Sequence, residues 1–200
     1  KKLTSKFALK KIKKVLLIQP PDIDKKSFNY AAGKRKRLYN YPPYGLGLVA
    51  SQLRKLKIQV DILNLNHEIL RHCVESKSDE TFNFDLCWQS ELKKKIEKFE
   101  PGFIGITSMF SQTHDVLVEI INYIKKEYKN ISIGAGGVHI TNSTSDEKTF
   151  DKFVADLINV DYFFLYEGDL SFVNFVKVFN EKENFERLGQ IIIRCEKNTF

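Results

Sequence analysis

The chain has 200 residues, of which 42% are hydrophobic and 28% are charged. This length and composition suffice for one domain with a buried core and argue against a disordered chain. No run of about 18 apolar residues could span a membrane, and the N-terminus lacks the apolar core of a signal peptide. The cysteines Cys73, Cys87 and Cys195 form neither a disulfide framework nor a CxxC or CxxxCxxC cluster. These features indicate a cytoplasmic protein and exclude a zinc or iron–sulfur site within this chain.

The net charge of +7 is concentrated near the N-terminus. Residues 1–40 hold 13 basic residues against Asp22 and Asp24, a net of +11, so the other 160 residues carry −4. The basic residues lie in a tail, residues 1–13, and in the loop Gly33–Arg37. Such patches can bind nucleic acid, but no nucleic-acid-binding motif accompanies them. The pattern therefore favours a solvated tail over a nucleic-acid site.

The first part of the chain predicts two strands with a loop and a helix between them. Lys14–Pro21 is a continuous apolar run that two prolines end, which is typical of a strand buried on both faces. Residues 22–43 are polar and basic and predict a long loop, after which a helix with one apolar side begins near Tyr44. Residues 58–65 alternate and predict a second strand. Residues 66–85 are ambiguous, with a loop favoured in their second half.

The remainder of the chain alternates between helices and strands. In chain order the sequence predicts a helix over 86–100, a strand over 103–110, a helix over 112–126, a strand over 131–135, a helix over 149–158, a strand over 160–166, a helix over 169–179 and a strand over 188–196. This alternation is the signature of βαβ units and predicts one doubly wound α/β domain with a parallel sheet.

Ligands of such sheets bind beyond the carboxyl ends of the strands. The segments expected there are Gln19–Pro21, Asn64–Glu68, Thr107–Thr113, Gly134–Thr141 and Tyr166–Asp169. They are rich in glycine, proline or hydroxyl groups, as the rim of a binding site would be.

Five of these stretches carry a resemblance to a known family. They are Gln19-Pro20-Pro21, the helix entrance Pro43-Tyr44-Gly45-Leu46, the strand Glu100-Pro101-Gly102-Phe103-Ile104-Gly105-Ile106, Gly136-Gly137-Val138-His139-Ile140-Thr141, and Tyr166-Glu167-Gly168-Asp169. The last four are similar to the motifs P-x-G-L, P-D-x-V-G-I, G-G-x-H-x-T and G-E-G-E, although Asp169 stands where Glu is more usual. In this order the five stretches resemble the cobalamin-binding domain that precedes many radical S-adenosylmethionine (SAM) enzymes.

The resemblance implies a flavodoxin-like, Rossmann-like sheet of five parallel strands with helices on both faces, formed by residues 14–182, and cobalamin as the ligand. It also implies that the nucleotide tail of cobalamin lies beside the fourth strand, where Gly136 and Gly137 leave room for it. A helix opened by Gly168, with Asp169 as its N-cap, would favour the phosphate. The cofactor-binding residues expected on this ground are Gln19, Pro20, Pro21, Tyr44, Gly45, Thr107, Ser108, Met109, Ser111, Gln112, Gly136, Gly137, His139, Thr141, Glu167, Gly168 and Asp169.

One departure bears on the cobalt. Cobalamin-dependent mutases and methionine synthase carry D-x-H-x-x-G after the first strand, and the histidine of this motif coordinates cobalt. Here residues 20–24 read Pro-Pro-Asp-Ile-Asp, without a histidine. The expected state is therefore base-off and His-off, with no metal ligand from this chain. Tyr44 and Gln112 are the candidates to cover the lower face of the cobalt.

The resemblance covers only one part of such an enzyme. Residues 183–200 resemble the linker strand that leads to the radical SAM domain, and the CxxxCxxC motif of that domain does not occur here. The 4Fe–4S cluster and S-adenosylmethionine are therefore expected only in an absent C-terminal domain of the same parent chain. The parent is expected to be methyltransferase-like. This chain alone is expected to bind cobalamin and to hold no catalytic residue.

Two other functions remain open at this point: a degenerate scaffold or interaction module without cofactor, and a flavodoxin-like binder of another nucleotide-tailed ligand. Fold alone excludes neither, although a scaffold has no need of small residues at the rim. His139 is equally open to ligand contact and to a structural role. His67, His72, His114 and the cysteines are predicted to be structural.

Overall fold

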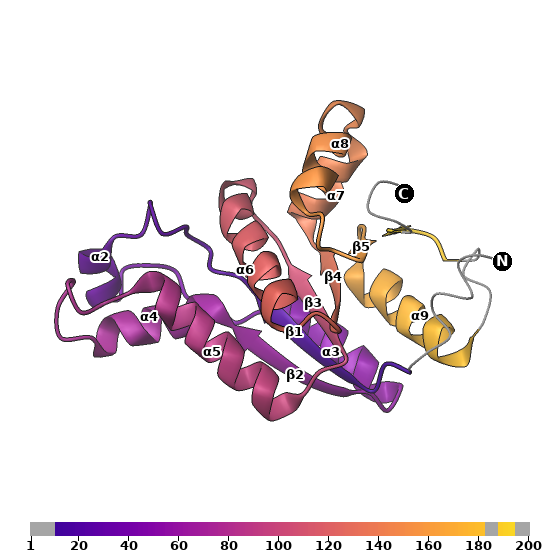
Figure 1. Cartoon of the computed structure of the whole chain (residues 1–200), viewed down its shortest axis with the longest axis horizontal. Coiled ribbons are helices and arrows are strands. Elements are labelled where there is room, and N and C mark those ends of the chain that lie inside the picture. The colour runs from indigo at the N-terminus through magenta and orange to yellow at the C-terminus, as the bar shows by residue number, and fades with distance from the viewer. Residues whose placement is uncertain (1–10, 183–187, 195–200) are drawn as a thin grey trace.

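The structure, a computed structural model, describes residues 11–182 and 188–194. These residues form a six-stranded sheet with the order β2-β1-β3-β4-β5-β6 (Figure 1). The strands are β1 (Lys14–Gln19), β2 (Gln59–Asn64), β3 (Phe103–Thr107), β4 (Ser132–Gly136), β5 (Tyr162–Phe164) and β6 (Ile191–Ile193). The first five run parallel, and β6 runs antiparallel to β5. The order 2-1-3-4-5 is that of flavodoxin-like sheets, in which the direction of winding switches between β1 and β3.

Helices cover both faces of this sheet. They are α2 (Tyr30–Lys34), α3 (Tyr44–Lys55), α4 (Leu65–Glu75), α5 (Phe84–Phe99), α6 (His114–Glu127), α7 (Val138–Ser145), α8 (Glu147–Asp156) and α9 (Gly168–Glu181), with a 3-10 turn η1 (Ser111–Thr113) before α6. Helices α4 to α8 contribute to the larger of two cores, on one face of the sheet. Helices α3 and α9 build the smaller core on the other face.

Strand β1 shows why a central parallel strand reads as an unbroken apolar run. Leu16 and Ile18 belong to the larger core, whereas Val15 and Leu17 belong to the smaller one. Because successive side chains of a strand point to opposite faces, a strand covered on both faces needs apolar residues at every position.

Three helices on the face with the larger core begin with a capping side chain. The side-chain oxygens of Asn64, Asn83 and Asp146 accept hydrogen bonds from backbone N–H groups in the first turns of α4, α5 and α8. Such a cap satisfies one of the N–H groups that a helix start leaves without a partner. Asn64 is also the last residue of β2, so strand and helix follow each other without a loop.

The predicted doubly wound α/β sheet with helices on both faces is confirmed, and the predicted number of strands is corrected from five to six. The sixth strand, β6, lies within 188–196, where the sequence predicted a strand but assigned it to a linker beyond the domain. It belongs to the sheet because Leu165 donates a backbone hydrogen bond to Gln190 and Arg194 donates one to Asp161. The guanidinium of Arg194 also donates to the carbonyls of Val154, Leu157 and Val160. The pairing covers the edge that β5 would otherwise expose.

Three segments differ from the sequence-based expectations. The ambiguous stretch after β2 contains α4, and the predicted loop 22–43 contains the short helix α2. The stretch Gly134–Thr141, expected as a rim loop, is the end of β4 followed directly by α7. Asp169 is not the N-cap of α9, since that place is held by Glu167 and Asp169 lies in the first turn.

The domain boundaries predicted at residues 13 and 183 lie close to the limits of the described residues. Residues 1–10, 183–187 and 195–200, and Cys195 with them, lie outside the described part of the chain. Within it, Ile12 is buried. Its backbone N–H donates to Asn180 Oδ1 at 2.7 Å, and its carbonyl accepts from Asn180 Nδ2 at 2.8 Å. The folded unit thus includes residues before Lys14. None of the described helices combines the length and the apolar character needed to cross a membrane.

Candidate functional site

A cavity of about 320 Å³ opens at the carboxyl ends of β3, β4 and β5, on the face of the sheet that α3 and α9 cover. We call it the site cavity. Its lining residues are Leu17, Gly45, Leu46, Leu48, Val49, Gly105, Ile106, Thr107, Met109, Gly134, Gly136, Gly137, Val138, Phe164, Tyr166, Glu167, Gly168, Asp169 and Phe172. The lining is mainly apolar, and the first turns of α3 and α9 form two of its walls. A concave apolar site with a few polar groups at its edge is typical of small-molecule and cofactor binding.

Glycines form part of the cavity floor. Gly105 of β3 and Gly134 of β4 are register partners in the sheet. A Cβ atom on Gly105 would lie 2.9 Å from the side chain of Leu17, and one on Gly134 would lie 2.5 Å from the ring of Phe164. Real Cβ atoms do not approach other atoms so closely. The floor therefore needs glycine so that the neighbouring side chains can pack beneath the cavity.

Two other glycines leave open space. Gly45, in the first turn of α3, would have no heavy atom within 4 Å of an added Cβ. Gly168 begins α9, and its added Cβ would meet only Val49, at 3.9 Å. Both residues line the site cavity. These wall glycines, rather than those of the floor, leave room that a side chain could fill without disturbing the protein.

Besides lining the site cavity, the pair Gly136–Gly137 takes part in a close approach between two loops of the protein itself. Gly137 has φ of +103°, and an added Cβ would lie 2.5 Å from the carbonyl oxygen of Ser108. The backbone N–H of Ser108 donates to the carbonyl of Gly136 at 2.8 Å, and the N–H of His139 donates to the carbonyl of Ser108 at 3.1 Å. Glycine is thus required at position 137 by the close approach of the protein's own backbone.

A second, smaller hollow lies where β1 and β3 end, at the switch in strand order. We call it the β1–β3 hollow, and it is lined by Gln19, Pro20, Pro21, Asp22, Thr107, Ser108, Met109, Phe110 and Thr113. It adjoins the site cavity, because Thr107 and Met109 line both. The Ser108 side chain is buried, and its Oγ has no hydrogen-bond partner within the described part of the chain. Such an orphaned hydroxyl is costly unless a ligand or a water satisfies it.

Exposed apolar side chains surround the mouth of the site cavity. Leu48, Met109, Val138 and Tyr166 line the cavity and still expose 45%, 52%, 52% and 59% of their surface. Single exposed apolar residues are ordinary, but a cluster around a cavity indicates a surface that something covers.

The structure brings most of the expected site residues to these two places and leaves five elsewhere. Those lining the site cavity are Gly45, Thr107, Met109, Gly136, Gly137, Glu167, Gly168 and Asp169. Those lining the β1–β3 hollow are Gln19, Pro20, Pro21, Thr107, Ser108 and Met109. Those lining neither are Tyr44, Ser111, Gln112, His139 and Thr141. Of these five, Tyr44, Ser111 and Gln112 are exposed. Thr141 Oγ1 accepts a hydrogen bond from the backbone N–H of Tyr166 at 2.9 Å and so holds the β5–α9 loop.

His139 points into the larger core instead of toward the site cavity. Its ring is buried, its Nε2 lies 3.1 Å from His114 Nδ1, and its Nδ1 lies 3.3 Å from Ser143 Oγ. The ring also packs edge-on against Phe153 of α8, with centroids 5.2 Å apart. Burial, and secondarily the neighbouring His114, lowers the pKa of His139 below its usual value. The structure therefore gives His139 structural contacts, because α7 turns its ring away from the rim.

Several cavity residues were not expected from the sequence. Leu17, Phe164 and Phe172 look like ordinary core residues in the sequence, and only the packing of β1, β5 and α9 brings them to the cavity. Gly105 and Gly134 carried a usable signal, since a glycine inside an apolar strand marks a close approach. Tyr166 lay within the expected rim segment Tyr166–Asp169 but was not singled out as a site residue, because a tyrosine after a strand has many ordinary roles.

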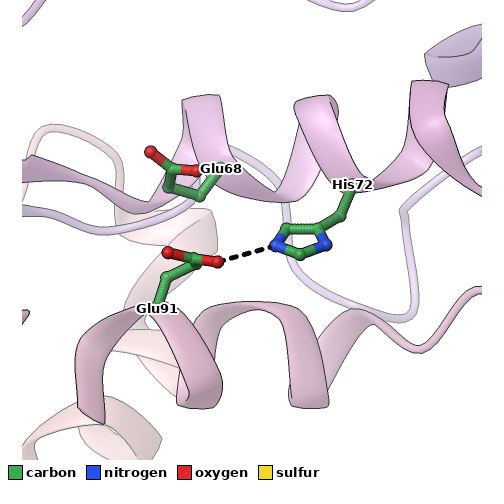
Figure 2. A group of neighbouring side chains, drawn as sticks. All are labelled: Glu68, His72 and Glu91. Carbon is green, nitrogen blue, oxygen red and sulfur yellow. Dashed lines mark hydrogen bonds and ion pairs between the residues drawn. The ribbon is translucent and has the colours of Figure 1, made fainter. Parts of the chain in front are cut away.

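One cluster among the described residues has the spacing of metal ligands: Glu68 and His72 of α4 with Glu91 of α5 (Figure 2). Their ligand atoms all lie within 4.8 Å of one another, and His72 Nε2 lies 3.0 Å from Glu91 Oε1. However, Arg71 donates to Glu68 at 2.7 Å, and Lys94 donates to Glu91 at 3.0 Å. Two cations already balance these carboxylates, so we assign an ion-pair network that joins α4 to α5.

Comparisons with known proteins agree with this geometry. A family model described as "B12 binding domain" matches residues 32–174. The cytidylyl-2-hydroxyethylphosphonate methyltransferase of Streptomyces wedmorensis is 26% identical over 138 residues, which cover 69% of this chain and 24% of that protein. A solved structure of the radical SAM methyltransferase TsrM from Kitasatospora setae, with tryptophan and the SAM analogue aza-SAM, has a TM-score of 0.63 at 16% identity. That match covers 93% of this chain and 29% of the TsrM chain. The matched part of this chain thus spans 24% to 29% of the length of these proteins.

Substitution of Gly137 should destabilise the protein. Gly137→Ala is expected to lower the free energy of unfolding by about 1–3 kcal/mol, because the residue would be held at positive φ against the carbonyl of Ser108. Gly47→Ala, at an exposed position of α3 with no neighbour within 4 Å, is the control and should stabilise by about 0.5–1 kcal/mol. Urea unfolding measures both. Equal stability of Gly137→Ala and the unmutated chain would contradict the close-approach argument.

The buried His139 should make stability depend on pH. Its folded-state pKa lies below the ordinary value of 6.5, so the unfolded chain takes up the proton first. The contribution of neutral His139 to the free energy of unfolding is therefore complete above pH 6.5 and is lost as the pH falls toward the lowered pKa. In His139→Asn, the free energy of unfolding should fall less between pH 7 and pH 5 than in the unmutated chain. His67→Asn, at an exposed histidine, is the control. An unchanged pH dependence in His139→Asn would show that another group titrates.

Proposed function

The chain belongs to the B12-binding domain family, and we propose that it holds cobalamin base-off and His-off, with the nucleotide tail in the site cavity. The observation that carries this proposal is the site cavity itself. It is an apolar slot of about 320 Å³ at the carboxyl edge of the sheet, with glycines in its floor and walls. The base of the nucleotide tail is a planar benzimidazole, which would fit such a slot. The volume of the cavity falls within the range of small-molecule pockets.

The polar groups at the rim fit the other parts of the tail. The N-termini of α3 and α9 both line the cavity, and the free N–H groups of a helix start favour a phosphate. Thr107 lines both the cavity and the adjoining hollow, and the buried Ser108 Oγ beside it lacks a partner. These two hydroxyls would donate to or accept from the base and ribose, which would satisfy the orphaned group.

The His-off state is supported by the surroundings of β1. The β1–β3 hollow presents Gln19, Pro20, Pro21 and Asp22, and none of the four histidines lines it or the site cavity. Gln19 Nε2 donates to Asp22 Oδ1 at 3.2 Å, so these side chains are engaged with each other. Tyr44 and Gln112, both exposed at this edge, remain the candidates to cover the lower face of the cobalt.

The proposed role of this chain in a larger protein is that of the cofactor domain. When bound, cobalamin supplies a cobalt atom that can accept and release a methyl group. The contribution of this chain is to bind the tail, to orient the corrin ring and to exclude water from its buried side, since the reactivity belongs to the cofactor. We propose that a radical SAM domain of the same parent, with its 4Fe–4S cluster and S-adenosylmethionine, faces the corrin, and that the parent is a methyltransferase.

The test is a titration of the purified chain with cobalamin, followed by calorimetry and by the visible spectrum together. Free cobalamin at neutral pH has its own base bound to cobalt, so saturable binding with a change to the base-off spectrum is expected. Binding with a base-on spectrum would contradict the tail-in-cavity geometry. Absence of binding would favour the scaffold alternative, and tighter binding of a flavin or adenine nucleotide would favour another nucleotide-tailed ligand.

A side chain at the cavity wall should exclude the tail without unfolding the protein. Gly45→Leu is expected to weaken cobalamin binding by about tenfold or more, the equivalent of about 1.4 kcal/mol, because Gly45 lines the cavity. Gly47→Leu is the matched control, since Gly47 lies in the same helix, is exposed and does not line the cavity. Circular dichroism establishes that both variants are folded. Equal affinities of the two variants would place the tail elsewhere.

A further inference from the structure

Tyr166 occupies a backbone conformation that suits glycine. Its φ is +57°, in the left-handed region, which a bulky side chain adopts only at a conformational cost. In the motif G-E-G-E that this stretch resembles, the corresponding position is glycine. The chain therefore carries a large ring at a place where the fold alone would be better served by no side chain.

The hydrogen bonds that hold this loop do not involve the ring of Tyr166. The backbone of the loop is held by the bond from the Tyr166 N–H to Thr141 Oγ1 at 2.9 Å, and by the bond from the Leu165 N–H to the carbonyl of Gln190 at 2.9 Å. Neither bond involves the tyrosine side chain. The residue is 59% exposed, and its ring stacks on no other aromatic ring of the described residues. A large residue that is held at positive φ and is mostly exposed points to a function.

The position of Tyr166 indicates which function. It lines the site cavity, as do the exposed Met109 and Val138 and the first turn of α9. A phenol ring at this mouth offers a flat apolar face to whatever enters the cavity, while its hydroxyl can remain in water.

We propose that Tyr166 stacks on the planar base of the ligand's nucleotide tail and closes the mouth of the site cavity over it. This inference rests on the proposed function, since it assigns a specific contact within that site. Stacking fits the contact because the face of an aromatic side chain pairs with the face of any heteroaromatic base without needing particular hydrogen bonds. The conformational cost of the left-handed tyrosine is then offset only when the ligand is bound.

The proposal predicts opposite effects of Tyr166→Gly on folding and on binding. Without ligand, the melting temperature of this variant should equal or exceed that of the unmutated chain, because glycine adopts positive φ freely. Its affinity for cobalamin should fall about tenfold, within the range measured for loss of one base–aromatic stack. Tyr166→Phe, which keeps the flat ring, should bind like the unmutated chain. Lys57→Gly is the matched control for backbone strain, since Lys57 has φ of +60° and does not line the cavity; its affinity should not change.

A second probe locates the contact on the ligand. Cobinamide has the corrin ring and lacks the nucleotide base, so Tyr166→Gly should leave its affinity unchanged. Equal weakening of cobalamin and cobinamide would overturn the assignment and place the ring against the corrin. Unaltered cobalamin binding by Tyr166→Gly would also overturn it. If the unmutated chain binds neither ligand, the proposed function itself fails and this inference fails with it.

Discussion

The rim of the site depends on the close approach of Ser108 to Gly137. Two backbone hydrogen bonds, Ser108 N–H to Gly136 and His139 N–H to Ser108, join the loop after β3 to the start of α7. The approach is possible because position 137 has no Cβ and holds φ of +103°. One turn later in α7, Thr141 Oγ1 accepts from the N–H of Tyr166. Three loops from three neighbouring strands are thus bonded to one another, and this fixes the side of the cavity that lies over β3, β4 and β5.

Some glycines around the cavity are needed for the packing of the protein, and others leave space for a ligand. Those of the floor let Leu17 and Phe164 pack close to the sheet, so they determine how deep the cavity is. Gly137 allows the positive φ that the backbone needs between β4 and α7. Gly45 and Gly168 serve neither purpose, since added Cβ atoms there would meet nothing closer than 3.9 Å. Open space that the protein leaves at two facing helix starts, and does not need for its own packing, is the feature that distinguishes a binding site from an imperfect core.

The sequence predicted the sheet better than it predicted the site. The unbroken apolar run of β1 and the strand–helix alternation were sufficient for the doubly wound fold, because burial on both faces leaves a clear pattern. Helix α4 was ambiguous because Asn64 ends β2 and caps the helix at once, which leaves no turn signal between them. The role of His139 was left open for a tertiary reason. Its neighbours His114 and Phe153 come from α6 and α8, and only the helical turn of α7 shows which way its ring points. The wall glycines were found through family motifs, whereas Leu17 and Phe172 gave no local sign of lining a cavity.

The cavity lining suits the proposed role of holding a cofactor. Its residues are apolar side chains, glycines, the hydroxyl of Thr107 and the carboxylates of Glu167 and Asp169 at the edge. Such a set binds by shape and by removal of apolar surface from water, which gives affinity without chemical activation. The same reasoning applies to the mouth, where Met109, Val138 and Tyr166 remain more than half exposed. Apolar surface clustered at the opening of a pocket is stabilised when a ligand or a second domain lies over it. Under the proposed function, a cofactor held here by its tail would present its reactive face outward, and the proposed radical SAM domain would approach from this edge of the sheet.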